Sequence, residues 1–340
     1  MKLSMKSLPQ NRIPLLYTAA ALLLLCVAVL SLFLGGTSLS LTALLKALLE
    51  GDRSAVSVRI FVYVRLPRTL AATVCGAALS CAGALSQSAL QNRLASPSIL
   101  GVNAGAGVAI TVATAFGIVG GIFTSLFAFL GALLATGLVA LFSHRFGLSR
   151  ANVILCGVAL NALFNAITSA LITLLPDVGV MSNDFRIGDF SAVTYRGLLP
   201  VSVIVLVALA FSFTLSNELD ALTLGDEHAI SIGISVYRMR TLLMLLIALL
   251  SGAAVSLCGL LSFVGLIVPH AIRLLGVHKS AHLLPLSALV GAAFVTLSDT
   301  LSRTLFSPYE IPVGVLMAIL GAPFFLFLLF SRKGEAYDRM

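Results

Sequence analysis

The sequence of 340 residues has few charged side chains. Asp, Glu, Lys and Arg together make up 10% of it, whereas a soluble domain carries roughly 25%. Apolar residue types account for 59% of the chain. So little charge cannot cover a globule with a water-compatible surface, which predicts that lipid surrounds the protein. The apolar runs are long and continuous rather than alternating, which favours membrane-spanning helices over membrane-spanning strands.

Motifs of nucleotide binding and catalysis are missing. The sequence contains no GxxxxGK[ST] phosphate loop, no HExxH helix and no GxSxG turn. ATP therefore cannot bind through the usual phosphate loop, and we expect no catalytic residue in this chain. The five cysteines lie inside apolar runs without a CxxC pair, and the five histidines lack metal-site spacing. We expect neither a metal site nor a cofactor-binding residue.

Carboxylates are also missing from the centres of the apolar runs. All thirteen acidic residues lie between the runs or close to their ends. Carriers driven by a proton or sodium gradient usually place ionisable groups at membrane depth, where these groups mark the ion pathway. This absence argues against a self-sufficient secondary carrier and suits a pore whose energy comes from another subunit.

The apolar runs predict an all-α, polytopic membrane protein with about ten transmembrane helices, forming a single transmembrane domain over residues 1–340. With ten spans both termini lie on one side, and assigning that side to the cytoplasm gives it 13 of the 21 Lys and Arg residues. A basic lead before the first run also suits a secretory signal, but the run is long for one. The predicted spans are 14–34, 69–91, 101–120, 122–142, 152–175, 197–215, 240–258, 261–276, 284–301 and 312–331.

A short sequence pattern occurs twice in the chain. Residues 76–86 match residues 252–262 at seven of eleven positions, and an Arg-Thr-Leu precedes each copy. In the ten-span topology the two copies run in opposite directions across the membrane. This predicts an inverted repeat with halves at about 60–195 and 236–331. Chance similarity between helices rich in small residues is the alternative.

Polar side chains within the predicted spans are candidates for a translocation path. Asn161 and Asn165 share one helix face at i,i+4 spacing, and Gln87 lies near the end of the second span. They either line a path for a polar cargo or hydrogen-bond across helices as packing contacts. The residues alone leave both interpretations open.

The segment 216–240 between the sixth and seventh spans has the features of a short surface helix. Gly225 provides a flexible start, Asp226 and Glu227 favour a helix N-terminus by charge–dipole attraction, and Gly233 can end the turn. Such a helix could receive mechanical force from a motor protein in the cytoplasm. A solvated connector is the alternative.

Five basic residues gather on the side that this topology assigns to the exterior, before or at the start of the second span. Because positive charge on that side runs against the usual topology rule, it calls for another cause, and docking of an acidic partner is one candidate. The five residues are Lys46, Arg53, Arg59, Arg65 and Arg68.

An ordered series of motifs runs between about residues 55 and 330. The series comprises Arg65-Leu-Pro-Arg-Thr-Leu70, Gly76-Ala-Ala-Leu-Ser, Gly83-Ala-Leu-Ser-Gln87, Asn92-Arg-Leu-Ala-Ser-Pro97, Leu100-Gly-Val-Asn-Ala-Gly105, Leu224-Gly-Asp-Glu-His-Ala229 with Ile232-Gly233, Phe263-Val-Gly-Leu-Ile-Val-Pro-His270 with Arg273, Ile311-Pro-Val-Gly314 and Gly321-Ala-Pro-Phe324. In this order the motifs resemble those of the FecCD-type permeases of ATP-driven importers for iron–siderophore, haem and cobalamin.

The resemblance implies a ten-helix permease subunit that pairs with a second copy or a paralogue. Two cytoplasmic ATPase subunits, which would hold the ATP and Mg, would bind beneath it, and an extracytoplasmic binding protein would deliver cargo. The ATPase would receive the coupling residues Leu224, Gly225, Asp226, Glu227, His228, Ala229 and Gly233. The binding protein would meet Arg65, Arg68 and Arg303, although Arg68 or Arg303 could instead pair internally with Asp299.

The same resemblance implies a multi-pass protein of the bacterial inner or plasma membrane with both termini cytoplasmic and no nucleic-acid partner. The expected cargo is an iron(III)–siderophore or a related metal chelate. Haem and cobalamin permeases share these motifs, so both remain alternatives.

Overall fold

The computed structural model describes residue 9 and residues 12–36, 40–52 and 54–337, and every regular element among them is a helix. The predicted all-α class is therefore confirmed. Ten helices form the body of the protein: α1 (Ile13–Phe33), α4 (Leu66–Ala89), α5 (Val102–Ala115), α6 (Gly121–Phe146), α7 (Arg150–Leu174), α10 (Tyr195–Thr214), α13 (Val236–Cys258), α14 (Val264–Leu274), α15 (Ser280–Thr304) and α16 (Val313–Tyr337).

Each predicted span coincides with one of these ten helices. Seven of the helices are long and apolar enough to cross a membrane, whereas α5, α14 and the described apolar part of α16 are shorter. Helix α14 has 11 residues, about 16 Å at 1.5 Å per residue, against a hydrocarbon core of about 30 Å. The predicted span 261–276 therefore reaches only part of the way across, and residues 259–263 before it are not helical.

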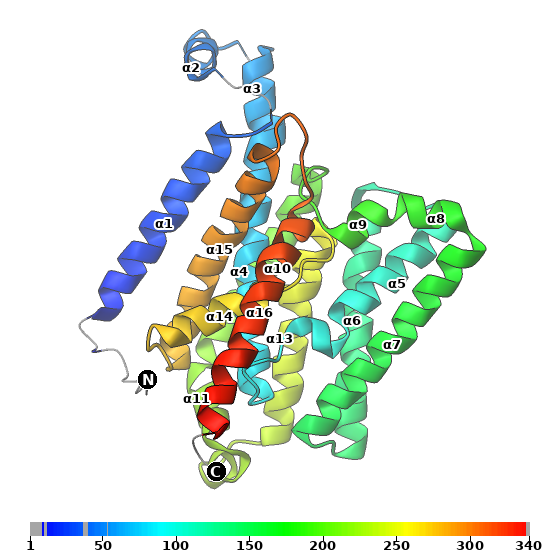
Figure 1. The fold of residues 1–340 in the computed structure, drawn as a ribbon, viewed down its shortest axis with the longest axis vertical. Coiled ribbons are helices and arrows are strands. Elements are labelled where there is room, and N and C mark those ends of the chain that lie inside the picture. The colour runs from blue at the N-terminus through cyan, green and yellow to red at the C-terminus, as the bar shows by residue number, and fades with distance from the viewer. Residues whose placement is uncertain (1–8, 10–11, 37–39, 53, 338–340) are drawn as a thin grey trace.

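Short helices lie at the two ends of this body (Figure 1). At one end, here called the α2 end, are α2 (Leu41–Leu49), α3 (Val56–Ile60), α8 (Pro176–Met181) and α9 (Asn183–Ile187). At the other, the α11 end, are α11 (Ser216–Leu224), α12 (Asp226–Ser231) and the start of α1. A π-helical turn, Phe61–Arg65, joins α3 to α4 in one helical stretch of 34 residues. This stretch is longer than a bilayer requires, so its first turns project at the α2 end.

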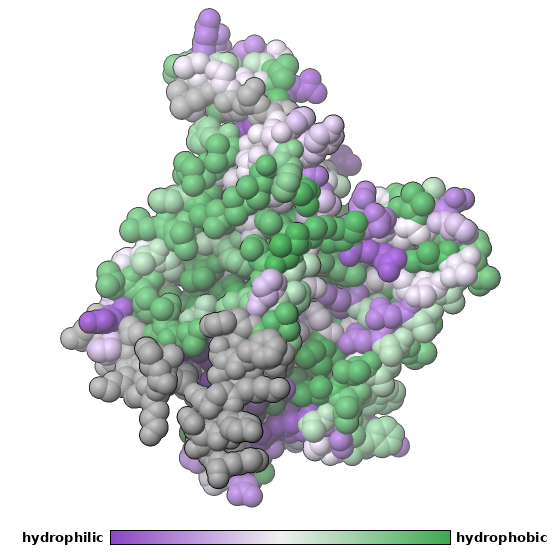
Figure 2. All heavy atoms as spheres, viewed as in Figure 1, coloured by the Kyte–Doolittle hydropathy of each residue, from purple (hydrophilic) through white to green (hydrophobic). Residues whose placement is uncertain are grey.

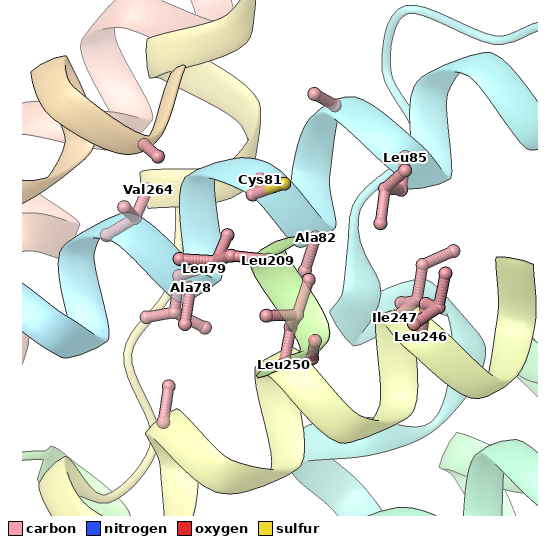
Figure 3. Packing of buried hydrophobic residues seen from close by; sticks show 14 of the residues in the cluster. Ala78, Leu79, Cys81, Ala82, Leu85, Leu209, Leu246, Ile247, Leu250 and Val264 are labelled. Atoms are coloured by element: carbon pink, nitrogen blue, oxygen red, sulfur yellow. The ribbon is translucent and has the colours of Figure 1, made fainter. Parts of the chain in front are cut away.

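Helix α4 runs through the centre of the molecule, and nineteen of its 24 residues are buried. Figure 3 shows its apolar side chains, among them Leu79 and Leu85, against Leu250 of α13 and Val264 of α14. Lipid supplies no hydrophobic drive between helices, so association depends on close packing through small side chains. Around α4 these contacts are backbone to backbone, because Gly76 faces the carbonyl of Gly291 and Gly83 faces Gly265.

The surface divides as expected of a membrane protein. Figure 2 shows apolar side chains over the middle of the drawn face and hydrophilic ones toward the two ends. Large apolar side chains are exposed on the outer helices, for example Leu25 of α1 at 61%, Leu134 of α6 at 60% and Leu206 of α10 at 63%. A protein surrounded by water rarely exposes so many large apolar side chains together, so this surface indicates contact with lipid.

An arginine of α4 is enclosed by three carboxylates at the α2 end. Arg68 Nε donates to Asp299 Oδ1 of α15 at 3.0 Å, and Nη1 donates to Glu310 of the α15–α16 loop at 2.8 Å. Its Nη2 also lies 3.6 Å from Asp189, which precedes α10. The Arg68 side chain is 6% exposed and that of Asp299 is fully buried, whereas that of Glu310 is 43% exposed. Segments far apart in sequence therefore meet at one guanidinium.

Two more arginines extend this cluster to α1. Arg303 Nε lies 3.4 Å from Asp299 Oδ2, and Nη2 donates to the Ser31 carbonyl at 3.0 Å. Arg65 Nη1 donates to the carbonyl of Leu32 at 3.0 Å. Three cations and three carboxylates thus balance at one end of the bundle. This matters because an unpaired charge out of water is costly.

The sequence left two roles open for Arg68 and Arg303, and in this structure both pair internally with Asp299. Arg65, Arg68 and Arg303 are 2%, 5% and 2% exposed. Docking of a binding protein through these three arginines stays a prediction. A buried guanidinium cannot meet a partner's carboxylate unless it gives up the contacts that hold it.

Replacing Gly83 by Ala tests the close contact of α4 with α14. The new Cβ would overlap the backbone of Gly265, so the helices must separate, at a cost of about 1–3 kcal/mol. We expect less monodisperse protein after heating in detergent, measured by size-exclusion chromatography. Gly137→Ala in α6 is the matched control, because a Cβ there meets nothing within 4 Å. Equal heat resistance of the two variants would contradict this packing.

Replacing Asp299 by Asn tests the charge cluster. Arg68 and Arg303 would both lose their buried carboxylate, which predicts a destabilisation of about 3–5 kcal/mol and a clearly lower temperature of unfolding. Glu50→Gln is the control, since its pair with Lys46 at 3.9 Å has side chains 58% and 76% exposed. That variant is expected to lie within about 0.5 kcal/mol of the parent protein. An unchanged Asp299→Asn protein would show that the cluster is not stabilising.

Candidate translocation site and coupling surface

A polar cavity of about 580 Å³ lies where α5, α7 and α9 meet. Its size is in the range of small-molecule binding sites. In Figure 2, hydrophilic side chains interrupt the apolar surface in the region between α16 and α7. The lining residues are Ser98, Asn103, Ala104, Gly107, Asn161, Asn165, Thr168, Asn183, Arg186, Ile187 and Leu260.

Helix α7 supplies one wall of this cavity. Ser149 caps the helix, its hydroxyl accepting from the amide of Asn152 at 3.3 Å. Helical periodicity then places Asn161, Asn165 and Thr168 on the same side. The two asparagines therefore line the cavity, as the translocation-path interpretation requires. Asn161 Nδ2 also donates to the Ser98 carbonyl at 2.9 Å. Asn161 therefore lines the cavity and also makes a packing contact with a neighbouring segment.

Helix α9 supplies the only charged lining residue of the cavity. Arg186 is exposed, and in the described part of the chain it has no carboxylate within ion-pair distance. Asn183, at the start of the same helix, adds an amide. The site therefore combines hydrogen-bonding groups of both kinds with one positive charge.

Gln87, the third residue predicted for the path, does not line this cavity. It is 3% exposed between α4 and α14, where Nε2 donates to the Gly265 carbonyl at 3.3 Å and Oε1 accepts from Arg273. In this structure Gln87 therefore makes the packing contacts of the alternative interpretation. The reason is that α4 is a central helix, so a polar group on it must find partners inside the protein.

Several lining residues escaped prediction from the sequence. Asn103 lies in a recognised motif, but nothing there marked it as lining. Asn183 and Arg186 lie in a connection that reads as an ordinary loop. Only the return of α8 and α9 toward α5 brings them to the cavity (Figure 1), and no spacing pattern encodes such a return.

The predicted coupling segment is helical, as its residues indicated. Helix α11 ends at Leu224 and α12 runs from Asp226 to Ser231. Gly225 between them has a φ of +126°, and Gly233 beyond α12 has a φ of +86°. Both angles lie in the region that favours glycine. The turn and the stop therefore follow from these two positions, with Asp226 and Glu227 in the first turn of α12.

Helix α12 and the residues on either side of it present apolar side chains at the α11 end. Ala229 of α12 is fully buried, whereas Leu224, Ile230 and Ile232 are 72%, 62% and 56% exposed. The side chains of Glu227 and His228 are exposed beside them. A mixed apolar and charged surface of this kind suits a protein partner.

Asp226 fastens α12 to two long helices. Its carboxylate receives Arg240 Nη2 of α13 at 2.7 Å and lies 2.6 Å from Arg150 Nη2 at the start of α7. Partial burial raises the pKa of Asp226, but hydrogen bonds and attraction from the two arginines outweigh it and hold the pKa below its usual value. Since α7 also carries Asn161 and Asn165, one helix connects α12 to the wall of the cavity.

Among the described residues, no group of three or more His, Cys, Asp and Glu side chains lies close enough together to hold a metal ion. Cys75, Cys81 and Cys258 are buried within the bundle as free thiols. The lining of the cavity likewise contains none of these four residue types.

Known proteins share this sequence and this fold. Residues 22–331 match the FecCD transport family. The chain is 35% identical over 307 residues to the Fe(3+)-citrate import system permease protein YfmD of Bacillus subtilis, covering 90% of this chain and 91% of that one. It is 37% identical over 286 residues to the vitamin B12 import system permease protein BtuC of Serratia proteamaculans, covering 81% and 83%.

A solved structure extends the likeness to three dimensions. An ABC transporter assigned to the metal-chelate type, in an inward-facing conformation, superposes with a TM-score of 0.78 at 32% identity, covering 94% of this chain and 99% of that one. Sequence and fold thus agree over nearly the whole chain. The protein belongs to the FecCD transport family and is a multi-pass membrane permease subunit of the ABC importer class.

Proposed function

We propose that this protein is the membrane subunit of an ATP-driven importer that moves an iron(III)–siderophore or a related iron chelate into the cytoplasm. The observation that carries the proposal is the link through Asp226. An exposed helix at the α11 end is joined by ion pairs to α7, the helix that walls a polar cavity. Helix α12 is exposed to a partner protein and is joined by an ion pair to the helix that lines the cavity. This arrangement suits a pore whose energy comes from another subunit.

Family membership and the relatives' names support the cargo class. One similar permease is named for Fe(3+)-citrate and another for vitamin B12. Haem and cobalamin therefore remain alternative cargoes. A secondary carrier is disfavoured because, among the described residues, Asp299 is the only carboxylate inside the seven helices that are long and apolar enough to cross a membrane. It lies in the last two turns of α15 and is paired with Arg68 and Arg303.

A second copy of the chain, or a paralogue, is proposed to complete the cavity. Helix α7 forms an outer edge of the molecule (Figure 1). It exposes Ala162, Ala166 and Ala170 at four-residue spacing, together with Asn165 and Ser169. Lipid contact favours large apolar side chains, whereas small residues at this spacing suit close helix packing. A symmetric pair would place two such walls face to face.

ATP hydrolysis is proposed to occur on two partner ATPase subunits that hold ATP and Mg, with no cofactor in this chain. They would bind at the α11 end, where Leu224, Ile230 and Ile232 are exposed. That end would face the cytoplasm of a bacterium, in agreement with the bias of Lys and Arg, and both termini would lie there. A substrate-binding protein would deliver cargo at the α2 end.

The coupling path follows from the contacts. Closure of the ATPase pair would displace α12, and Asp226 would transmit the displacement to Arg150 of α7 and Arg240 of α13. Because α7 is one continuous helix, movement at Arg150 shifts Asn161 and Asn165 on the cavity wall. This is alternating access with the energy supplied by another subunit.

Co-purification tests the subunit assignment. The tagged chain, expressed with its genomic neighbours and extracted in detergent, is expected to bring down an ATPase subunit in about equal amount. The ATPase activity is expected to rise when a binding protein loaded with an iron chelate is added. A chain that purifies alone and transports in liposomes under an ion gradient would instead identify a self-sufficient carrier.

Replacing Asp226 by Asn tests the coupling path. The variant is expected to keep ATP hydrolysis, but the cargo moved per ATP is expected to fall about fivefold or more. A change of about fivefold is the lower end of the usual range of coupling between two sites. Glu50→Gln, a charge removal at the opposite end, is the control.

The same contact sets an expectation for pH. A lowered pKa means that the Asp226 ion pairs are present above the ordinary carboxylate value near about 4 and are lost only as the pH falls below it. Coupling by the parent protein at about pH 6 to 8 is therefore expected not to change through this group. If the Asp226→Asn variant moves as much cargo per ATP as the parent protein, Asp226 is not part of the coupling path.

A further inference from the structure

We propose that the cavity between α5, α7 and α9 selects anionic, oxygen-rich metal chelates of the hydroxycarboxylate type, and that Arg186 sets this preference. This inference rests on the proposed function, because it takes the cavity as part of the translocation path. It goes further by naming the charge and the donor atoms of the cargo.

The lining offers many hydrogen bonds and one charge. Four asparagines, one serine and one threonine supply donors and acceptors, and Arg186 adds a guanidinium. No lining residue is acidic. Asn161 Nδ2 and Thr168 Oγ1 already donate to backbone carbonyls, so the other lining amides and Arg186 are the donors for carboxylate and hydroxyl oxygens on the outside of a chelate. A guanidinium is the best single partner for a carboxylate.

The charge of Arg186 is available to a ligand. Arg68, Arg240 and Arg303 have carboxylate partners within 3.4 Å. Arg186 has none within ion-pair distance in the part of the chain that the structure describes. The acidic residue nearest in sequence, Asp184, is exposed and does not line the cavity.

The lining also indicates that the metal passes inside its chelator. Iron(III) removed from a chelator would require ligands such as carboxylate, imidazole or thiolate. The lining has no Asp, Glu, His or Cys side chain. The cavity can therefore hold the outer surface of an intact complex but cannot compete for its metal.

Haem fits this lining poorly. A flat apolar macrocycle calls for apolar and aromatic walls, and its iron is held by axial groups such as His, Cys, Met or Tyr. Here the lining contains none of these and no aromatic residue, and only Ala104, Ile187 and Leu260 carry apolar side chains. The chemistry of the lining therefore ranks haem below a hydroxycarboxylate chelate as cargo.

Direct binding to the permease–ATPase complex in nanodiscs, without a binding protein, tests the charge preference. The probe is radioactive iron(III) citrate, measured by scintillation proximity. We expect saturable binding that weakens about tenfold or more in Arg186→Gln, the range for one lost charge-assisted contact. Arg186→Lys is expected to retain most of the affinity, and a neutral iron(III) trihydroxamate is expected to compete poorly.

Arg196→Gln is the matched control, because Arg196 is exposed at the start of α10 and does not line the cavity. Unchanged binding in Arg186→Gln, equal competition by the neutral chelate, or no saturable binding of iron(III) citrate would each overturn the inference. These outcomes leave the proposed function standing if the ATPase co-purifies and is stimulated. A chain that brings down no ATPase would overturn the proposed function itself.

Discussion

Close backbone contact along α4 is the constraint on which the rest of the structure depends. In lipid an apolar side chain gains little by leaving the solvent, so helices stay together only where their surfaces fit at short range. Glycine permits that fit where Gly76 meets Gly291 and Gly83 meets Gly265. These contacts join α4 to α15 and α14. With α4 buried at the centre, the helices that carry function can lie at the periphery, where partners and solutes reach them.

Charged groups in this bundle follow one rule at two places. At the α2 end, Arg68 and Arg303 share the buried carboxylate of Asp299. At the α11 end, Asp226 is held between Arg150 and Arg240. Each arrangement satisfies charges that would otherwise be costly away from water. The cavity differs, because Arg186 has no carboxylate within ion-pair distance among the described residues, and its proposed partner is a ligand.

Helix α7 connects the two functional regions. Its first residue, Arg150, contacts Asp226 of α12, the helix proposed to meet the ATPase, while Asn161 and Asn165 lie three to four turns further along. A rigid helix transmits displacement along its axis without an elaborate network. Its exposed small residues add a third role, as the edge at which a second copy is proposed to pack.

The amino-acid sequence by itself determined the helical class, the approximate limits of the ten helices and the form of the coupling segment. These properties depend on local features: the length of apolar runs, and glycines at 225 and 233 where the backbone takes positive φ. The shortness of α14 was missed because the run from 261 to 276 is mostly apolar, and composition does not show where a helix begins. The family followed from an ordered series of motifs, none of which is specific alone.

Only the tertiary structure decided which polar residues face a cavity and which face a neighbouring helix. Asn161 and Gln87 look alike in sequence, yet one lies on a peripheral helix and the other on a central one. Arg68 is buried with its charge compensated because Asp189, Asp299 and Glu310 converge on it from distant segments. Arg186 reaches the cavity only because α9 folds back toward α5. Pairing of this kind depends on contacts between segments far apart in the chain, which local patterns do not encode.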